Sequence, residues 1–322
     1  MIISRTPFRI TLAGGGTDLP SFYEDHGGSV ISMAIDKYIY VNLKYRFFDD
    51  NIRIRYLKDE YVNSVYDLKH DRAKEALIRN GILNNVEITS IADLPAKSGM
   101  GSSGSFLVAM LSAIKALKKE ELDLSAICEE ACDIEINTLK LPSGKQDQYI
   151  AAHGGVKILD INKKGNVDVN CIINEFDTTS LLKYMNVYKI GVDRNASDIL
   201  KDQNNKKPQT VSSLSSIMSM TDDFLNHLIE NNFYEYGKLL DIYWAEKKKL
   251  SHKMSTEKVD AMYKISKNKF GILGGKVIGA GGGGFLMLFG EANKDLDKFM
   301  LQNNMSKLNF AIDTEGLKVY EL

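Results

Sequence analysis

The sequence has 322 residues, a length that favours two domains of roughly 150 residues each. Hydrophobic residues make up 44% and charged residues 26%, as in an ordinary globular protein. The net charge of -1 argues against a dedicated nucleic-acid binder, which is usually basic, and against an acidic disordered chain. Three cysteines, an odd number, exclude a disulfide framework and indicate a reducing compartment.

Membrane and export signals are the next features to look for. No run approaches about 18 consecutive apolar residues, the length that a membrane-spanning helix requires. The opening segment, residues 1–10, lacks the basic and then apolar pattern of a signal peptide. We therefore expect a cytoplasmic protein that binds neither a membrane nor a nucleic acid.

The N-terminal segment is typical of β-strands. Polar and apolar residues alternate around residues 9–12, and runs rich in β-branched and aromatic residues follow at 30–35, 38–45 and 52–56. The segment Gly14–Asp18 interrupts this pattern with consecutive glycines, which indicates a tight turn.

The middle of the chain alternates predicted helices with strands. Apolar residues recur there at helical spacing, and proline or glycine punctuates the pattern. We predict helices over residues 71–80, 107–117 and 125–138, a strand over 86–91, and a hairpin of 156–161 with 167–173.

The C-terminal half is mostly helical. We predict a strand at 187–192, helices between 210 and 269, two strands around a glycine turn at 277–289, a helix over 293–302 and two short final strands. We place the domain boundary near residue 180, which gives domains of residues 1–180 and 181–322. No linker rich in proline or serine separates them, so the halves should pack closely.

The segment Ser98–Gly104 carries the strongest chemical signal. Its three glycines let backbone N–H groups approach a ligand, and Ser102 and Ser103 stand at the mouth of a predicted helix. A helix N-terminus with free N–H groups attracts anions, so we favour a phosphate site here. The alternative is that one serine merely caps the helix, but capping does not require three spaced glycines.

The surroundings of this loop narrow the kind of phosphate ligand. Gly99-x-Gly101-x-x-Gly104 matches the dinucleotide fingerprint, yet Pro95-Ala96-Lys97 separates the preceding strand from the glycines. A second helix also stands where the fingerprint requires a strand with an acid, and no lysine follows the glycines as in a Walker loop. The sequence therefore indicates a third kind of loop, in which backbone amides and serines bind the phosphates.

Two acids and a second glycine run complete the candidate set. Glu135 on a helix and Asp147 in the loop Pro142–Gln148 suggest a division of labour. One can bind Mg²⁺ while the other orients or deprotonates a hydroxyl, although either acid alone is more simply a solvated surface group. Gly279–Gly284 allows close backbone approach, and its alternative role is packing in a hairpin.

Three ordered motifs resemble those of the GHMP kinases, the superfamily of galactokinase, homoserine kinase, mevalonate kinase and phosphomevalonate kinase. They are Pro7–Asp18, Leu94–Gly104 and Gly279–Gly284. Within that superfamily, Arg9–Pro20, Gly144–Tyr149 and Asp193–Leu200 most resemble the D-glycero-D-manno-heptose 7-phosphate kinases. That family makes a heptose 1,7-bisphosphate on the route to nucleotide-activated heptose for bacterial surface polysaccharide.

The motifs identify the sugar substrate less specifically than they identify a kinase. Gly15 and Gly16 stand where galactokinase-like enzymes have Glu-His, which argues against galactose and leaves room for a larger or differently oriented sugar. Fucokinase-like relatives share some of these features, so an unphosphorylated sugar is the alternative substrate.

The resemblance implies an α+β, α/β sandwich-like, two-domain GHMP kinase fold. Its N-terminal domain would be ribosomal-protein-like α/β and would bind ATP, and its C-terminal domain would be ferredoxin-like α+β. ATP and Mg²⁺ are the implied cofactors. The implied partner is a small-molecule sugar phosphate in the cleft between the domains, and the oligomeric state stays open, with a homodimer as one option.

The resemblance also implies roles for single residues. Asp147 would be the base for the anomeric C1 hydroxyl, and Arg9 would keep that acid ionised. Glu135 and Ser103 would bind Mg²⁺, with Ser102 as the alternative hydroxyl. The implied ATP-binding residues are Pro95, Lys97, Ser98, Gly99, Met100, Gly101, Ser102, Ser103 and Gly104. The substrate-binding candidates are Gly15, Gly16, Thr17, Asp18, Gly144, Lys145, Arg194, Ser197, Gly281 and Gly282.

Residue type suggests how the 7-phosphate would be held. Arg194 with Ser197 is our first candidate for the clamp, and Lys145 is the second, because a guanidinium binds phosphate in a bidentate way. The run Lys247–Lys249 is instead predicted to be a solvated helix end, where cations suit the helix dipole. Trp244, with Tyr243 and Leu240, is predicted to be core.

Two other classes of function compete with an active kinase. A non-catalytic sugar and nucleotide sensor could have the same fold, but the presence of Arg9, Ser103, Glu135 and Asp147 favours the enzyme. A nicotinamide-dependent oxidoreductase would explain the glycine spacing, but the strand and acid that its fingerprint requires are missing.

Overall fold

A computed structural model describes residues 1–96, 98–190, 199, 202, 204, 206–279, 281, 283–291 and 293–322. Among these residues, no helix combines the length and the apolar character that crossing a membrane would require.

Eight strands of the described residues form one sheet, in the order β11-β1-β2-β5-β3-β4, with β6 paired to β2 and β7 to β6. The strands are β1 (Ile2–Ala13), β2 (Gly28–Tyr45), β3 (Ile52–Arg55), β4 (Asp59–Val62), β5 (Val86–Ala92), β6 (Val156–Ile161), β7 (Val167–Cys171) and β11 (Lys318–Glu321). The two predicted strands at 30–35 and 38–45 form the single strand β2. The pairing register between β1 and β2 shifts between Pro7 and Phe8. This irregularity lets the two strands stay paired on both sides of the gap between the two predicted segments.

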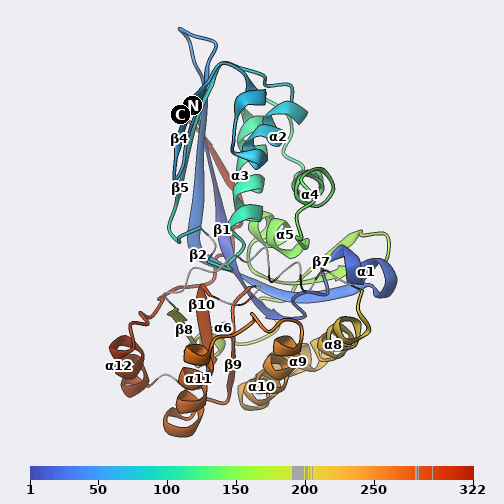
Figure 1. The fold of residues 1–322 in the computed structure, drawn as a ribbon, viewed down its shortest axis with the longest axis vertical. Coiled ribbons are helices and arrows are strands. Elements are labelled where there is room, and N and C mark those ends of the chain that lie inside the picture. The colour runs from blue at the N-terminus through green and yellow to red at the C-terminus, as the bar shows by residue number, and fades with distance from the viewer. Residues whose placement is uncertain are drawn as a thin grey trace.

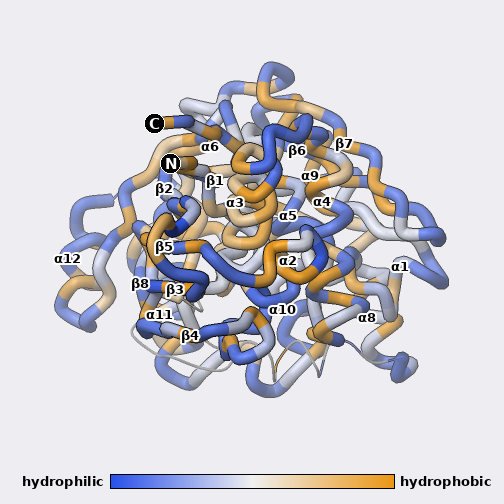
Figure 2. Tube along the Cα trace, turned by 90° about the horizontal axis from the view of Figure 1, so that it is seen from above, coloured by the Kyte–Doolittle hydropathy of each residue, from blue (hydrophilic) through white to orange (hydrophobic). Residues whose placement is uncertain are grey.

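Four helices cover one face of this sheet (Figure 1). They are α2 (Asp71–Arg79), α3 (Ser102–Leu117), α4 (Leu124–Asp133) and α5 (Gln146–His153). Every residue from Gly104 to Ile114 of α3 is buried, because this helix packs on β1 and β2 and is itself flanked by α2, α4 and α5. Figure 2 accordingly shows α3 as largely hydrophobic at the centre of the molecule, with hydrophilic segments in the outer loops.

A second, three-stranded antiparallel sheet lies below the first in Figure 1 and has the order β8-β10-β9. Its strands are β8 (Met185–Lys189), β9 (Gly274–Val277) and β10 (Phe285–Phe289). The predicted helical region contains α8 (Pro208–Ser219), α9 (Thr221–Ile229), α10 (Phe233–Lys249) and α11 (Glu257–Phe270), and α12 (Lys294–Gln302) follows β10. The predicted core residues Leu240, Tyr243 and Trp244 are buried on α10.

The two ends of the chain meet in the first sheet. β11 pairs antiparallel with β1, and the amino group of Met1 donates a hydrogen bond of 2.8 Å to the carbonyl of Leu322. Only one of the two short strands predicted at the end forms; isolated bridges at Lys307 and Ile312 accompany it in the described residues.

Several elements were not predicted. These are α1 (Pro20–His26), a 3₁₀ turn at Val65–Asp67, α6 (Thr178–Tyr184), β4 and α5. The most consequential is α5, because the segment around Asp147 was predicted to be a loop. Asp147 is instead the second residue of a helix, and its side chain is therefore fixed by a regular element.

Candidate active site

The glycine-rich loop leads into α3 without a side-chain cap. Gly101 is the N-cap residue, with φ of 84°, and neither serine accepts a capping hydrogen bond at this helix end. The simple capping interpretation of Ser102 and Ser103 is therefore wrong. Both serines line a cavity of about 740 Å³, together with Gly99 and Gly101, so the first N–H groups of α3 are left for a ligand.

The two glycine motifs of the sequence pack directly against each other. A Cβ added to Gly99 would come within 2.5 Å of the Ile278 carbonyl oxygen, and one added to Gly279 would come within 2.2 Å of the Gly99 carbonyl oxygen. A Cβ on Gly284 would lie 2.1 Å from the Ser98 carbonyl oxygen. Only glycine permits this backbone contact, which joins the loop before α3 to the turn between β9 and β10.

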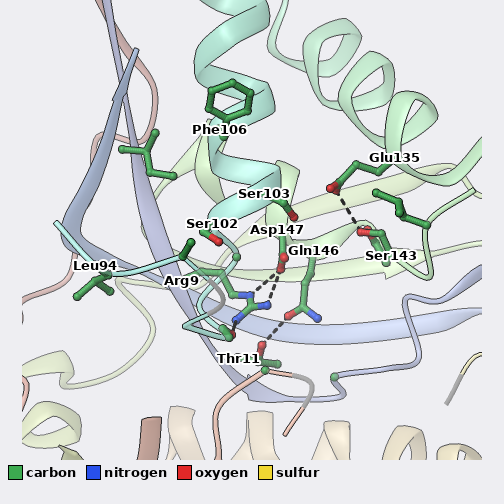
Figure 3. Close-up of a pocket in the computed structure, with 18 of the residues that line it drawn as sticks. Arg9, Thr11, Leu94, Ser102, Ser103, Phe106, Glu135, Ser143, Gln146 and Asp147 are labelled. Carbon is green, nitrogen blue, oxygen red and sulfur yellow. Dashed lines mark hydrogen bonds and ion pairs between the residues drawn. The ribbon is translucent and has the colours of Figure 1, made fainter. Parts of the chain in front are cut away.

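Arg9 and Asp147 form the central ion pair of the cavity (Figure 3). Arg9 Nε donates to Asp147 Oδ1 at 2.7 Å, and Arg9 Nη2 lies 2.6 Å from the same oxygen. Arg9 Nη1 donates to the Gly99 carbonyl at 2.6 Å, so one guanidinium ties the proposed base to the phosphate loop. The Asp147 side chain is 19% exposed and reaches the cavity.

Gly104 of α3 and the N-cap residue Gly101 let Asp147 come this close. A Cβ on Gly104 would lie 2.6 Å from the Asp147 Cβ, and one on Gly101 would lie 3.2 Å from its Cγ. Burial raises the pKa of the Asp147 carboxyl; the Arg9 guanidinium opposes this, while the negative charges of Asp18 and Glu135 add to it. Arg9 therefore favours the ionised form of this acid, as expected, although burial outweighs its effect on the pKa.

Glu135 is fully buried at a π-helical turn, Ile134–Thr138, that continues α4. Its carboxylate accepts hydrogen bonds from Arg72 Nε at 2.6 Å, Gln148 Nε2 at 2.7 Å and Ser143 Oγ at 3.2 Å. Glu135, Ser143 and Arg72 all line the cavity. The sequence analysis missed Arg72, since nothing near it in the chain links this helix residue to Glu135.

Asp18 marks the opposite wall of the cavity. Its carboxylate accepts hydrogen bonds from the Gly16 amide at 3.0 Å, the Gln146 amide at 3.2 Å and Gln146 Nε2 at 3.3 Å. Gln146 Oε1 in turn accepts from the Thr11 hydroxyl at 2.6 Å, below the Arg9 pair in Figure 3. Gly144 makes room for this carboxylate, because a Cβ there would lie 2.0 Å from Asp18 Oδ2 and the Asp18 side chain would have to shift.

The cavity brings together most, but not all, of the predicted site residues. Those that line it are Arg9, Gly15, Gly16, Asp18, Pro95, Gly99, Gly101, Ser102, Ser103, Glu135, Gly144 and Asp147. Ser98, Met100 and Gly104 are buried behind the wall and shape the loop. Lys97, Arg194, Ser197 and Gly282 lie outside the described residues.

Three predicted substrate ligands are engaged elsewhere. The Thr17 hydroxyl donates to the carbonyls of Gly14 and Ser29 within the turn. Lys145 Nζ donates to both Glu129 carboxylate oxygens, at 2.8 and 2.9 Å, and to the Gly165 carbonyl at 2.6 Å. Gly281 packs on Met254, whose Sδ would lie 2.3 Å from an added Cβ. None of the three lines the cavity among the described residues.

Two buried lysines at the floor of the cavity were not predicted as site residues. Lys247 is 5% exposed and donates to the Gly15 carbonyl at 2.5 Å, so the prediction of a solvated helix end is wrong for this residue. Lys276 is 3% exposed and donates to the Leu12 carbonyl at 3.3 Å. Lys247 follows Tyr243 by four residues and Leu240 by seven, and this helical spacing is the signal that could have revealed it.

The other end of the cavity is apolar and aromatic. The His70 ring meets Tyr56 edge to face and Phe106 at a tilt, with centroid separations of 4.7 and 4.8 Å. Ile39, Leu57 and Leu94 also line the cavity. Burial lowers the pKa of His70, whose Nδ1 accepts the Ala73 amide at the start of α2. A neutral, apolar pocket of this kind suits a planar heterocycle.

Family models match both parts of the chain. The model of the GHMP kinases N terminal domain matches residues 61–155, and that of the GHMP kinases C terminal matches residues 225–306, together more than half of the chain. A D-glycero-alpha-D-manno-heptose 7-phosphate kinase of Campylobacter jejuni is 27% identical, over 100% of this chain and 99% of that protein. An L-fucokinase/L-fucose-1-P guanylyltransferase of Bacteroides fragilis is 26% identical over 89% of this chain and 34% of its own length.

Solved structures show the same fold. A D-glycero-D-manno-heptose 1-phosphate kinase from Bacteroides thetaiotaomicron superposes with a TM-score of 0.81 at 23% identity, over 100% of this chain and 99% of that one. Galactokinase from Lactococcus lactis, complexed with galactose, superposes with a TM-score of 0.74 at 15% identity, over 100% of this chain and 95% of that one.

Proposed function

The chain belongs to the GHMP kinases, and we propose that it phosphorylates the anomeric C1 hydroxyl of D-glycero-D-manno-heptose 7-phosphate with ATP. The observation that carries the proposal is the Arg9–Asp147 pair, which stands between the glycine loop and the polar wall around Asp18. The full-length similarity to a heptose 7-phosphate kinase supports the choice of sugar.

We assign the donor to the glycine loop and the aromatic end. The N–H groups at the start of α3 would bind the ATP phosphates, and the pocket of Tyr56, His70 and Phe106 would take the adenine. We retain residues 1–180 as the ATP-binding domain and 181–322 as the C-terminal domain, with β11 returning to the first sheet.

Asp147 and Arg9 would carry the transfer. The C1 oxygen attacks the γ-phosphorus while the bond to the bridging oxygen of ADP breaks, and Asp147 accepts the hydroxyl proton. Arg9 positions Asp147 through two guanidinium nitrogens and adds positive charge beside the transferred group. Asp18 would accept hydrogen bonds from sugar hydroxyls, since its oxygens face the same cavity.

The residues present also fit a magnesium ion. Mg²⁺ in kinases is held by one or two carboxylates together with substrate phosphates and water, so a cluster of three protein ligands is not needed. No cluster of three His, Cys, Asp or Glu side chains occurs in the described part of the chain. Glu135 and Ser103 offer a buried carboxylate and a hydroxyl at the cavity wall. When bound, the ion would neutralise charge on the transferring phosphates.

Release of ADP from Mg-ATP tests the proposal against a panel of acceptors. The panel contains D-glycero-D-manno-heptose 7-phosphate, sedoheptulose 7-phosphate, mannose 6-phosphate, fucose, galactose and mevalonate. We expect turnover of the manno-heptose 7-phosphate. Turnover of fucose or galactose instead would keep the kinase and discard the sugar phosphate, and ATP binding with no turnover at all would favour a sensor.

A further inference from the structure

We propose that Lys247 and Lys276 form an anion subsite for the phosphate monoester that the sugar substrate carries away from its reacting hydroxyl. This inference rests on the proposed function, and it names the part of the cavity that would distinguish a sugar phosphate from a free sugar. It also departs from the clamp predicted from the sequence, in which Lys145 was a candidate, because Lys145 is committed to Glu129 and Gly165.

The two lysines reach the cavity from the C-terminal part of the chain. Lys247 lies on α10 and donates to the carbonyl of Gly15, in the turn after β1. Lys276 lies on β9 and donates to the carbonyl of Leu12, near the end of β1. Thr11 directly precedes Leu12, and Asp18, the proposed sugar ligand, follows Gly15 by three residues; both line the same cavity. The lysines are therefore placed on the acceptor side of Arg9 and Asp147.

Both cations are buried without a compensating acid. Among the described residues, neither lysine forms a salt bridge, and each ammonium uses one of its three donors on a backbone carbonyl. The nearby Asp18 carboxylate is already bonded by the Gly16 amide and by Gln146. Burying a charge is costly unless it is paired, so two unpaired ammonium groups indicate a place prepared for an anion.

The acids near the two lysines are already engaged by other groups. Arg9 pairs with Asp147 and Arg72 with Glu135, so these two acids are already matched by other cations. Asp18 attracts Lys247 but forms no ion pair with either lysine among the described residues. Burial lowers the pKa of Lys247 to about 8, against the attraction of Asp18, and lowers that of Lys276 well below its ordinary value, so a bound anion would favour the charged form of both lysines. The Lys276 ammonium lies 4.8 Å from the centre of the Tyr243 ring, which offers only partial compensation.

A phosphate monoester matches this charge and donor pattern. It carries about −1.5 to −2 at neutral pH and presents three acceptor oxygens, which suits two ammonium groups with donors to spare. The unphosphorylated sugars of related kinases would leave both lysines uncompensated. The subsite should therefore favour a phosphorylated acceptor.

The test compares matched pairs of sugars by isothermal titration calorimetry on the full chain. The pairs are D-glycero-D-manno-heptose 7-phosphate with the free heptose, and mannose 6-phosphate with mannose. The variants are Lys247→Met and Lys276→Met, with Lys248→Met as the control. Lys248 is the next residue on α10, but it is exposed and pairs with Asp260 at the surface. Thermal unfolding checks the fold of each variant, and replacing an unpaired buried charge by methionine should not lower stability.

We expect the wild type and Lys248→Met to bind at least one phosphorylated sugar at least tenfold more tightly than its free counterpart. Each cavity variant should lose roughly 10- to 100-fold in affinity for the phosphorylated sugar, the weight of a charged hydrogen bond, with little change for the free sugar. In ADP-release assays, the KM for the sugar phosphate should rise while the KM for ATP stays constant.

The outcomes separate this inference from the proposed function. Equal binding of phosphorylated and free sugars by the wild type overturns the subsite, and so does the absence of binding by both sugar phosphates. A preference that survives in both folded lysine variants also overturns it and leaves the kinase intact. Preferential binding that the lysine variants lose, without any ADP release, supports the subsite and discards the proposed transfer.

Discussion

Replacing Asp147 by asparagine removes the proposed base and keeps the shape of the side chain. The carboxylate oxygen Oδ1 accepts Arg9 Nε at 2.7 Å and lies 2.6 Å from Nη2, and an amide oxygen can take the same place. An amide cannot accept the proton of a sugar hydroxyl. We therefore expect Asp147→Asn to lower kcat by at least about a hundredfold, the usual contribution of a positioned acid–base group.

ADP release at saturating Mg-ATP, with the acceptor identified in the panel, measures this effect. The matched control is Asp168→Asn, which changes an exposed acid on β7 in the same way and should leave kcat unaltered. The KM for ATP should change little, because the donor binds mainly to the glycine loop and the aromatic pocket. Turnover of Asp147→Asn within about threefold of the wild type would refute the role of Asp147 as the base.

The pH dependence follows from the raised pKa of Asp147. Its role requires the ionised form, so kcat/KM should fall as the pH drops through a value above about 3.9, the ordinary pKa of an aspartic acid. The stability of the fold has the opposite pH dependence. Burial disfavours the ionised Asp147 carboxylate, so its contribution to the free energy of unfolding becomes less favourable as the pH rises through the raised pKa of Asp147. The unfolding temperature of Asp147→Asn relative to the wild type should therefore be highest at neutral pH, and a kcat/KM constant down to pH about 4 would contradict the assignment.

Three further substitutions test other parts of the cavity. Gly104→Ala would place a methyl group 2.6 Å from the Asp147 Cβ, so calorimetry should show a loss of about 1–3 kcal/mol in stability, and kcat should fall. An unchanged unfolding temperature would contradict the close packing of α3 and α5. Glu135→Gln should raise the Mg²⁺ concentration for half-maximal ADP release; an unaltered Mg²⁺ requirement would remove Glu135 from the metal site. Leu57, which is 83% exposed, lines the apolar end, so Leu57→Ser should raise the KM for ATP about threefold to tenfold with no change in unfolding temperature or sugar KM.

The local elements of the site could be predicted because their causes are local. Spaced glycines followed by an apolar helical pattern predict a loop that leads into a helix, and α3 does follow Gly99 and Gly101. It begins at Ser102, earlier than the predicted start at residue 107, and includes Gly104. Phosphate binding by this loop stays a prediction. The prediction failed at α5, where Pro142 and Gly144 indicated a loop around Asp147. The helix forms there because Gln146 and Gln148 find partners on Asp18 and Glu135, which lie far away along the chain.

The charges of the cavity depended on which side chains fold together. Lys145 is a residue type that often binds phosphate, but here it forms an ion pair with Glu129 instead. The lysine run that contains Lys247 is typical of a solvated helix end. Lys247 nevertheless lies on the same face of α10 as the buried Tyr243 and is itself buried. Sequence proximity does not reveal the pairing of Lys145, because Glu129 lies on another element, α4. The burial of Lys247 does have a local signal, which is its helical spacing from Tyr243 and Leu240.

The sequence by itself determined the kinase motifs, their order and the residues Arg9, Glu135 and Asp147, since glycine spacing and residue chemistry act over a few neighbouring positions. The tertiary structure alone decided which charges face the cavity and which are paired elsewhere. It joins Arg9 to both Asp147 and Gly99, encloses Glu135 with Arg72, and leaves Lys247 and Lys276 without an acidic partner among the described residues. The physical reason is that an ion's partners and its dehydration are set by packing between distant segments, whereas a glycine turn or a helix start is set by the chain itself.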